Sequence, residues 1–214
     1  MALYKNKYRI ETTRLQTWDY RWNAAYFITI CTKHKEHFFG EIVDGNKENE
    51  MHYTDSGKFA WNCWAEIPEH FPYITLDAFT VMPNHLHGIL ILNNPGPVDM
   101  PHCNLSDIRN NSDMPYDSEI RTSSTSEYDD DDTQAKLKTK NKTMSVISPK
   151  KGSISTILRS YKSAVSKQAH LLNPQFLWQE RFYDHIIRNE EEFYKIRNYI
   201  LTNTQNWKED MFYN

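Results

Sequence analysis

The stretch "YITLDAFTVMPNHLHGILILN", residues 73–93, decides the fold. It contains two runs of apolar, β-branched and aromatic residues, 73–82 and 85–93, separated by the turn dipeptide Pro83-Asn84. The pattern predicts two strands that form an antiparallel hairpin. Because side chains alternate between the two faces of a strand, His85 and His87 should project from one face and Leu86 from the other.

The two histidines have a possible chemical use. Side chains at i and i+2 of a strand lie about 7 Å apart along it, and neutral imidazoles so placed can bind one divalent ion such as Zn, Mn, Co or Ni. A single histidine on a strand is usually only a half-buried polar residue. The pair therefore predicts a metal site only if a third ligand and a reactive group come from elsewhere in the chain.

Composition limits the class of protein. The 214 residues suffice for one domain with a long insertion, and 39% hydrophobic content is low for a chain that packs throughout. Three cysteines without CxxC spacing argue against a disulfide framework or a cysteine-built zinc site. We expect a cytoplasmic protein without a signal peptide or membrane span. The net charge of −3 does not by itself indicate nucleic-acid binding.

Residues 95–150 differ from the rest of the chain. They have no sustained apolar period, and residues 99–132 hold ten acidic and two basic residues, whereas 133–151 hold six basic and no acidic ones. Such a segment cannot bury enough apolar surface to offset its ordering entropy. We therefore predict a single domain made of residues 1–94 and 151–214, interrupted by a disordered low-complexity insertion at 95–150.

The remaining elements follow from hydrophobic periodicity and capping signals. Asn189 should cap the last helix, with Glu192 completing a capping box. The other predicted elements are a strand at 24–32, a short strand at 38–43, a helix at 53–71 capped by Thr54 or Ser56, a helix at 153–172, an extended segment at 176–188 that ends in a strand, and a helix at 190–207.

This order predicts an α+β fold. The first six main elements match the split βαββαβ pattern of a ferredoxin-like fold, an antiparallel sheet with helices on one face. The last helix is additional. It could cross the free face of the sheet, where the histidine pair would otherwise meet water.

The last helix carries the second half of a possible site. Tyr199 and Asn203 are four residues apart and therefore share one helix face. Two imidazoles and an amide oxygen can hold a divalent ion that polarises a phosphodiester, and a phenol can attack phosphorus to form a covalent intermediate. A helical tyrosine is more often a packing residue, and an asparagine near a helix end more often eases that end.

Several motifs resemble the single-tyrosine HUH transposases of insertion sequences, most closely the REP-associated tyrosine transposase group. The resemblance covers everything except 95–150 and the extreme termini. It is carried by "AYFITICT", "GKFAWNCWAEIPEHFP", "FTVMPNHLHGILIL", "ILRSYKSAVSK" and "WQERFYDHIIRNEEEFYKIRNYILTN". The combination of the His-Leu-His triplet with "YILTN" at this distance is more specific than either motif alone.

The resemblance implies a function. It makes Tyr199 the nucleophile and His85, His87 and Asn203 the ligands of a divalent ion, Mg or Mn. It implies a bacterial enzyme, nucleoid-associated when bound to DNA, that cleaves and rejoins single-stranded DNA near a hairpin or palindromic repeat through a 5′-phosphotyrosine, as a monomer or homodimer. Relatives often have proline after the asparagine, where this chain has Thr204.

Alternatives remain for several residues. Tyr161, Tyr183 and Tyr194 compete with Tyr199 as nucleophile, although Tyr161 falls on an apolar helix face. Trp178 or Phe182 could stack on bases. Candidate DNA-binding side chains are Arg159, Lys162, Arg181, Arg188 and His185. A different class of function, a domesticated and non-cleaving nucleic-acid-binding protein, fits the same sheet.

Overall fold

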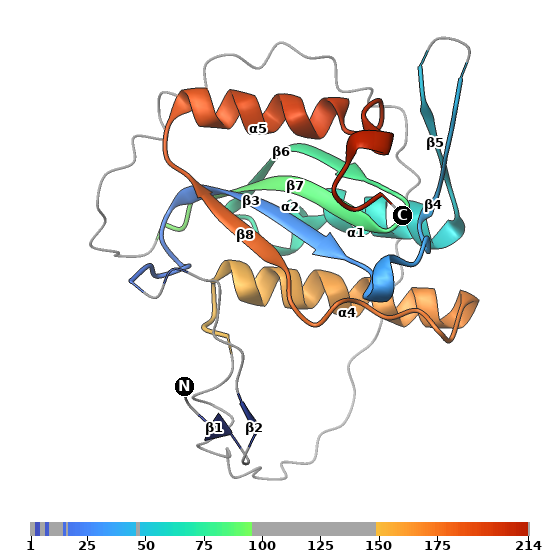
Figure 1. Cartoon of the computed structure of the whole chain (residues 1–214). Helices are drawn as coiled ribbons and strands as arrows, with labels where there is room; N and C mark the ends of the chain where they lie inside the picture. Colours follow the sequence, from blue (N-terminus) through green and yellow to red (C-terminus); the bar gives the residue numbers. More distant parts are fainter. Residues whose placement is uncertain are drawn as a thin grey trace, which may run out of the picture.

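The computed structural model describes residues 15, 17–45, 48–95 and 149–213, together with the short strands β1 (Leu3–Tyr4) and β2 (Lys7–Tyr8) (Figure 1). Residues 96–148 of the predicted insertion lie outside the described residues, so its disorder and the proposed domain division stay predictions. None of the described helices has the length and apolar content needed to cross a membrane.

A four-stranded sheet forms the centre of the domain, and each neighbouring pair of strands is antiparallel. The strands in spatial order are β6 (Ile74–Val81), β7 (His85–Leu92), β3 (Ala24–Cys31) and β8 (Tyr183–Ile187). The turn at Pro83-Asn84 joins β6 to β7 as predicted. The predicted α+β fold with an antiparallel sheet is confirmed.

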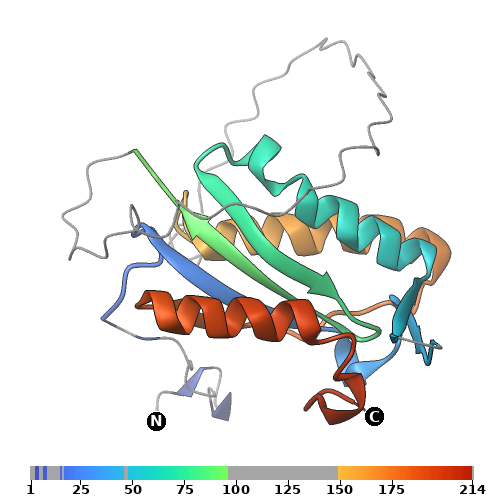
Figure 2. The ribbon, with the colours of Figure 1, turned by 90° about the horizontal axis from the view of Figure 1, so that it is seen from above.

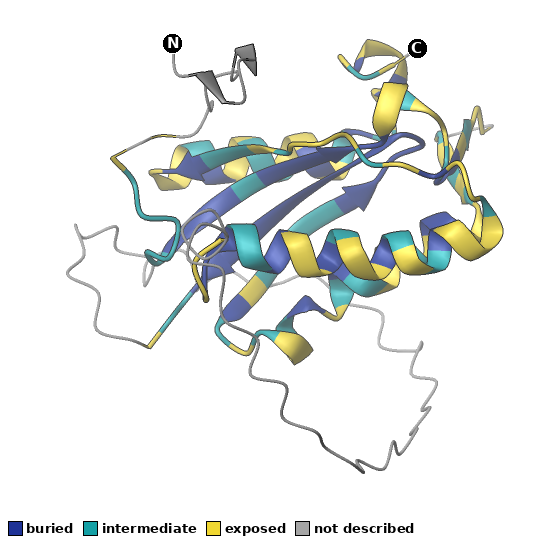
Figure 3. Cartoon of the chain, turned by 90° about the horizontal axis from the view of Figure 1, so that it is seen from below, coloured by how far each residue is buried: buried dark blue, intermediate teal, exposed yellow. Residues whose placement is uncertain are grey.

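Two helices, α1 (Asp55–Ala65) and α4 (Ile154–Leu172), cover one face of this sheet. They bury one set of alternating strand residues, which includes Tyr26, Ile28, Leu86 and Leu90. Thr54 caps α1, because its hydroxyl accepts a hydrogen bond from the Gly57 amide at 3.1 Å. Figure 3 shows the central strands as largely buried.

The single helix predicted at 53–71 is divided. The short helix α2 (Ile67–His70) follows α1 after Glu66 and carries Pro68 in its first turn. Proline lacks an amide hydrogen and cannot continue the hydrogen bonding of a preceding helix, so it suits the start of a new one. The boundary prediction was therefore wrong at this point, and the proline gives the physical reason.

The opposite face of the sheet is crossed by α5 (Glu190–Thr202) (Figure 2). Phe193 and Ile200 pack there with Ala25, Ile89 and Ile187. Asn189 caps the helix by accepting from the Glu192 amide at 2.8 Å. The Glu192 carboxylate bonds the Arg188 amide rather than that of Asn189, so the predicted capping box is displaced by one residue.

The last helix is shorter than predicted. It ends at Thr202, and Trp207 begins a separate 3₁₀ turn, η3 (Trp207–Glu209). Asn and Thr side chains after Thr202 compete for local backbone groups and are weak helix formers. The chain is thereby free to turn back over the sheet after Asn203.

A side hairpin, β4 (Gly40–Val43) with β5 (Glu50–Tyr53), extends beyond the main sheet. The first arm corresponds to the strand predicted at 38–43. Its partner "EMHY" was missed, because four residues of mixed polarity carry little periodic signal. The Asn49 amide reaches the Gln205 side-chain oxygen at 2.8 Å, which ties the hairpin to the segment after α5.

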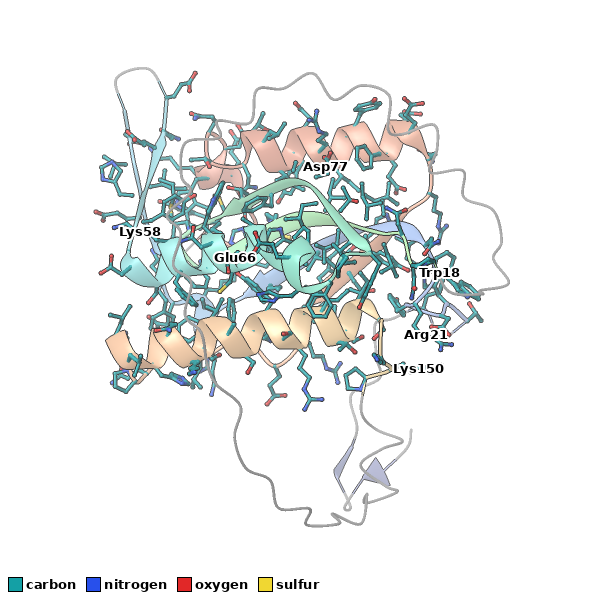
Figure 4. The ribbon with its side chains drawn as sticks, turned by 180° about the vertical axis from the view of Figure 1, so that it is seen from behind. Trp18, Arg21, Lys58, Glu66, Asp77 and Lys150 are labelled. Atoms are coloured by element: carbon teal, nitrogen blue, oxygen red, sulfur yellow. The ribbon has the colours of Figure 1, made fainter. Side chains whose placement is uncertain are left out.

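One ion pair fixes α5 over the edge strand β6. The pairing of β6 with β7 is irregular between Leu76 and Phe79, and Asp77 lies in this irregular region. Its Oδ1 lies 3.0 Å from the Nε of Arg197. Figure 4 marks Asp77 beneath α5, seen from behind.

Gly88 supplies a test of the sheet–helix packing. A Cβ added there would lie 2.5 Å from the Cζ2 of Trp64 and 3.1 Å from the Cβ of Phe79. Gly88→Ala should therefore lower the free energy of unfolding by about 1–3 kcal/mol, measured as a lower denaturant midpoint at constant m. The exposed Thr75→Ala on β6 is the control, expected to change it by less than about 0.5 kcal/mol. Equal stability of Gly88→Ala and wild type would contradict the tight packing.

Candidate active site

His85 and His87 lie at the start of β7 and face the α5 side of the sheet. Their strand neighbours are Cys31 and Thr29 on β3. Both side chains are buried, at 0% and 1% exposure, and their ring centroids are 4.5 Å apart. The alternation of β7 thus brings the two imidazoles together, while Leu86 lies in the opposite core.

Asn84 fixes the tautomer of His85. The Asn84 Nδ2 donates to the carbonyls of Lys35 and Phe212, at 3.2 and 2.9 Å, so its Oδ1 is the atom 2.7 Å from the His85 Nδ1. Because an amide oxygen only accepts, the His85 Nδ1 carries the hydrogen. The Nε2 of His85 is therefore a lone-pair acceptor, and it is buried without a hydrogen-bond partner. This is the form in which histidine binds metals.

His87 is oriented in a similar way by the neighbouring strand. Its Nδ1 lies 2.8 Å from the Thr29 Oγ1. Burial lowers the pKa of His87 to about 4, although the charge of Asp210 acts in the opposite direction. Burial also holds the pKa of His85 well below 6.5, helped by the neighbouring His87. Both imidazoles are therefore neutral at pH 7, as metal ligation requires.

The end of α5 places Tyr199 and Asn203 beside the histidines. The Tyr199 hydroxyl lies 3.2 Å from the Nε2 of His87, and the tyrosine is 40% exposed. Asn203 is buried, and its Oδ1 has no hydrogen-bond partner. The structure thus brings together all four residues that the sequence predicted for this site. Their roles stay predictions.

Asp210 completes the cluster, and the sequence reasoning missed it. Its Oδ2 accepts from the Tyr199 hydroxyl at 3.1 Å and from the Asn203 Nδ2 at 2.7 Å, and lies 4.0 Å from the His87 Nε2. Ligand atoms of His85, His87 and Asp210 lie within 4.8 Å of one another. Asp210 follows a 3₁₀ turn, so no helical spacing relates it to Tyr199, and no motif marked it.

The carboxylate has two consequences. Since a carboxylate only accepts, it holds the Nδ2 of Asn203 and leaves Oδ1 as the free ligand atom. Burial raises the pKa of Tyr199 above 10, and the charge of Asp210 and its hydrogen bond raise it further. The phenol is thus protonated at neutral pH, and the Asp210 carboxylate, to which its hydroxyl donates at 3.1 Å, can accept its proton.

The last residues of the described chain close the site over His85. The Phe212 ring centroid lies 4.6 Å from that of His85, and Trp207 lies at 6.0 Å. The Phe212 amide donates to the Asp210 Oδ1 at 2.6 Å. Lys35 donates to the Met211 carbonyl at 3.0 Å. These contacts exclude water around the His85 Nε2, which has no hydrogen-bond partner, and they fix the Asp210 carboxylate.

The residues fit a divalent ion. Two buried atoms with lone pairs, the Nε2 of His85 and the Oδ1 of Asn203, have no other partner. The Nε2 of His87 and a carboxylate oxygen of Asp210 lie next to them. A mixed set of imidazole nitrogens and hard oxygens suits Mn, Zn or Co, and the oxygen donors also suit Mg.

The predicted DNA-binding residues are divided between two faces. Arg159 and Lys162 lie on α4, which covers the face opposite Tyr199. The Lys162 Nζ donates to the Gln179 carbonyl at 2.7 Å and lies over Trp178, and burial lowers its pKa. His185 lies on the Tyr199 side of β8 and is bonded to Glu192 at 2.8 Å. Arg181 and Arg188 are exposed at the two ends of β8.

The competing tyrosines have other environments. Tyr161 is buried, and its hydroxyl donates to the Ala60 carbonyl at 3.2 Å, as expected for a packing residue. Tyr194 is exposed on α5 and contacts Phe193. Tyr183 is exposed on β8 and contacts Phe27. Among the four, only the Tyr199 hydroxyl is hydrogen-bonded to a histidine in the described residues.

Comparison with known proteins gives a sequence relative and several similar solved structures, including the following two. An uncharacterised protein of Haemophilus influenzae is 31% identical over 201 residues, covering 94% of this chain and 91% of that protein. The structure is similar to a REP-associated tyrosine transposase bound to a REP hairpin, with a TM-score of 0.46, 16% identity, and coverage of 98% and 74% of the two chains. It is also similar to a candidate transposase of Deinococcus radiodurans, with a TM-score of 0.36 and 12% identity, covering 89% of this chain and 97% of that chain. No family profile matches the chain.

The cluster predicts that metal binding stabilises the fold. Saturating Mn²⁺, at about a hundredfold excess over its Kd, should raise the free energy of unfolding by about 2.7 kcal/mol, seen as a higher Tm. His85→Ala should lose most of this shift because it removes an unpaired buried ligand atom. His52→Ala, an exposed histidine on β5, should keep it. The same shift in His85→Ala and wild type would count against the site.

Proposed function

The chain belongs to one protein family with the Haemophilus influenzae protein, and we propose that it is a metal-dependent transposase. In this proposal it cleaves and rejoins single-stranded DNA near hairpins through a 5′-phosphotyrosine. One observation carries the proposal. The hydroxyl of Tyr199 lies 3.2 Å from the Nε2 of His87, in a cluster where two buried atoms that could bind a metal, the Nε2 of His85 and the Oδ1 of Asn203, have no hydrogen-bond partner.

The ligands of the ion would be the Nε2 atoms of His85 and His87 and the Oδ1 of Asn203. The Asp210 carboxylate is a further oxygen donor within reach. When bound, a divalent ion supplies Lewis-acid polarisation of a phosphodiester oxygen and offsets the charge that develops on it. The donor set supports Mn²⁺ or Mg²⁺ as that ion.

The residues of the chain perform the rest of the reaction. The Tyr199 oxygen attacks phosphorus, forming one P–O bond while the bond to the 3′-oxygen of the preceding nucleotide breaks. The phenolic proton passes to the Oδ2 of Asp210, the atom that it already contacts at 3.1 Å. The Asp210 carboxyl then gives this proton to the leaving 3′-oxygen, so the products are a 5′-phosphotyrosine and a free 3′-hydroxyl.

The reaction conserves the energy of the phosphodiester. A 3′-hydroxyl can attack the phosphotyrosine, return the proton to Tyr199, and form a new phosphodiester, so that strand transfer needs no external energy source. Tyr199 is 40% exposed, so the backbone of an unpaired DNA strand can approach its hydroxyl. The sequence motifs, rather than this geometry, support a hairpin or palindromic repeat as the landmark on the substrate.

Tyr199→Phe tests the nucleophile. The variant should bind Mn²⁺ and DNA as wild type does, because the ring and ligands remain, but it should form no covalent adduct. The assay incubates the protein with hairpin-bearing single-stranded DNA and Mn²⁺, then maps any DNA-linked peptide. Tyr194→Phe is the control and should form the adduct. DNA attached to Tyr161, Tyr183 or Tyr194 would refute the assignment, and an absence of any adduct with wild type would favour the non-cleaving binding protein.

Asp210→Asn tests the proton acceptor. Asparagine keeps the shape of the side chain but cannot accept the phenolic proton. The cleavage rate should fall by roughly 10²–10⁴-fold, while DNA binding is retained. The neighbouring, exposed Glu209→Gln should cleave normally. A wild-type rate for Asp210→Asn, measured in single-turnover assays, would remove Asp210 from the proposed reaction.

A further inference from the structure

A row of side chains runs across the sheet from the site to its edge. In the register of the strands, Thr29 of β3 lies between His87 of β7 and Tyr183 of β8. All three face the side that α5 crosses. Thr29 is the residue that bonds the Nδ1 of His87. Tyr183 is therefore one strand further from the histidines than Thr29, on the edge strand of this sheet.

Phe27 connects this edge to the nucleophile. Its ring is stacked on His87 with centroids 5.4 Å apart, and it contacts Tyr183 and Tyr199 edge-on, each at 6.2 Å. Phe27 is only partly buried, whereas Tyr199 is 40% and Tyr183 54% exposed. The four rings make a continuous aromatic surface that begins inside the site and ends in solvent.

The course of α5 explains why this surface is open. Arg197 ties one flank of the helix to Asp77 on β6, at the opposite edge of the sheet. Tyr199 is two residues further along, about 200° around the helix axis, so it projects from the flank that faces β8. The C-terminal half of α5 thus lies toward β6 and leaves Tyr183 exposed.

A positive charge lies on the same flank of α5. Lys195 is exposed and precedes Tyr199 by four residues, which places it one turn away on the same side of the helix. Glu192, a further turn back, has its carboxylate held 2.8 Å from the Nε2 of His185. The aromatic surface is therefore bordered by an exposed lysine one helical turn from Tyr199.

We propose that Phe27 and Tyr183 form a stacking site for an unpaired nucleobase next to the scissile phosphate, with Lys195 contacting a flanking phosphate. The proposal rests on the proposed function for the identity of the strand. Aromatic rings bind any base through its π-face, so the site positions a strand without reading its sequence. Trp178 and Phe182, which the sequence suggested for stacking, pack instead against the opposite core.

The test compares two probes that differ only in their bases. One is an oligothymidylate of about 20 nucleotides, and the other is an abasic strand of the same length and charge. Binding of the full chain to each is followed by fluorescence anisotropy in EDTA at fixed salt, so that no cleavage occurs. Tyr183→Ala should weaken binding of oligothymidylate by about 5- to 150-fold and leave binding of the abasic strand within about twofold of wild type.

Matched variants complete the design. Tyr183→Trp should keep the affinity for oligothymidylate, and Tyr183→Thr, which suits an edge strand but has no ring, should behave like Tyr183→Ala. Tyr194→Ala removes another exposed tyrosine, on a different side of α5, and should change the binding of neither probe. Lys195→Ala should weaken both probes alike, because it removes a phosphate contact.

Two failures are distinguishable. Suppose that wild type forms the DNA adduct. If Tyr183→Ala then binds oligothymidylate with wild-type affinity, or loses affinity for both probes equally, the stacking site is overturned and the proposed cleavage reaction stands. If no adduct forms but Tyr183→Ala loses only oligothymidylate, the cleavage reaction is overturned and the stacking site stands.

Discussion

The alternation of side chains along β7 is the constraint on which the rest of the structure depends. This strand is buried on both faces. Leu86, Leu90 and Leu92 fill the core beneath α1 and α4, so His85 and His87 must enter the second core. A buried imidazole without partners would cost about 1–3 kcal/mol for each unsatisfied atom. The surrounding segments bond the Nδ1 of each ring, whereas the Nε2 of His87 contacts Tyr199 and the Nε2 of His85 has no partner.

Asn84 connects several parts of the fold to the buried His85 ring. Its side chain is fully buried and bonds the Lys35 carbonyl after β3, the His85 ring, and the Phe212 carbonyl near the C-terminus. Three distant parts of the chain are therefore held around one imidazole. The segment after α5 belongs to the site for the same reason, since it supplies both this carbonyl and the Asp210 carboxylate.

The parts of the site that depend on local periodicity could be predicted from the sequence. The histidine pair follows from a period of two, and the shared face of Tyr199 and Asn203 from a spacing of four. Asp210 could not be predicted, because its position depends on a turn that follows the helix. The sequence suggested Trp178 or Phe182 as aromatics that could stack on bases, but both pack against the core. Which aromatic rings are exposed depends on where α4 and α5 pack, and periodicity does not carry that information.

The site combines buried side chains with an exposed edge. The proposed ligand atoms come from a central strand and a helix end, where the side chains are buried and neighbours on several sides restrict them. Tyr183 comes from an edge strand, where fewer neighbours restrict it and solvent has access. A nucleobase requires contact area rather than exact atom positions, so an edge strand suffices for it. In the proposed function, the same sheet would hold the reacting groups rigidly at its centre and accept single-stranded DNA of variable sequence at its edge.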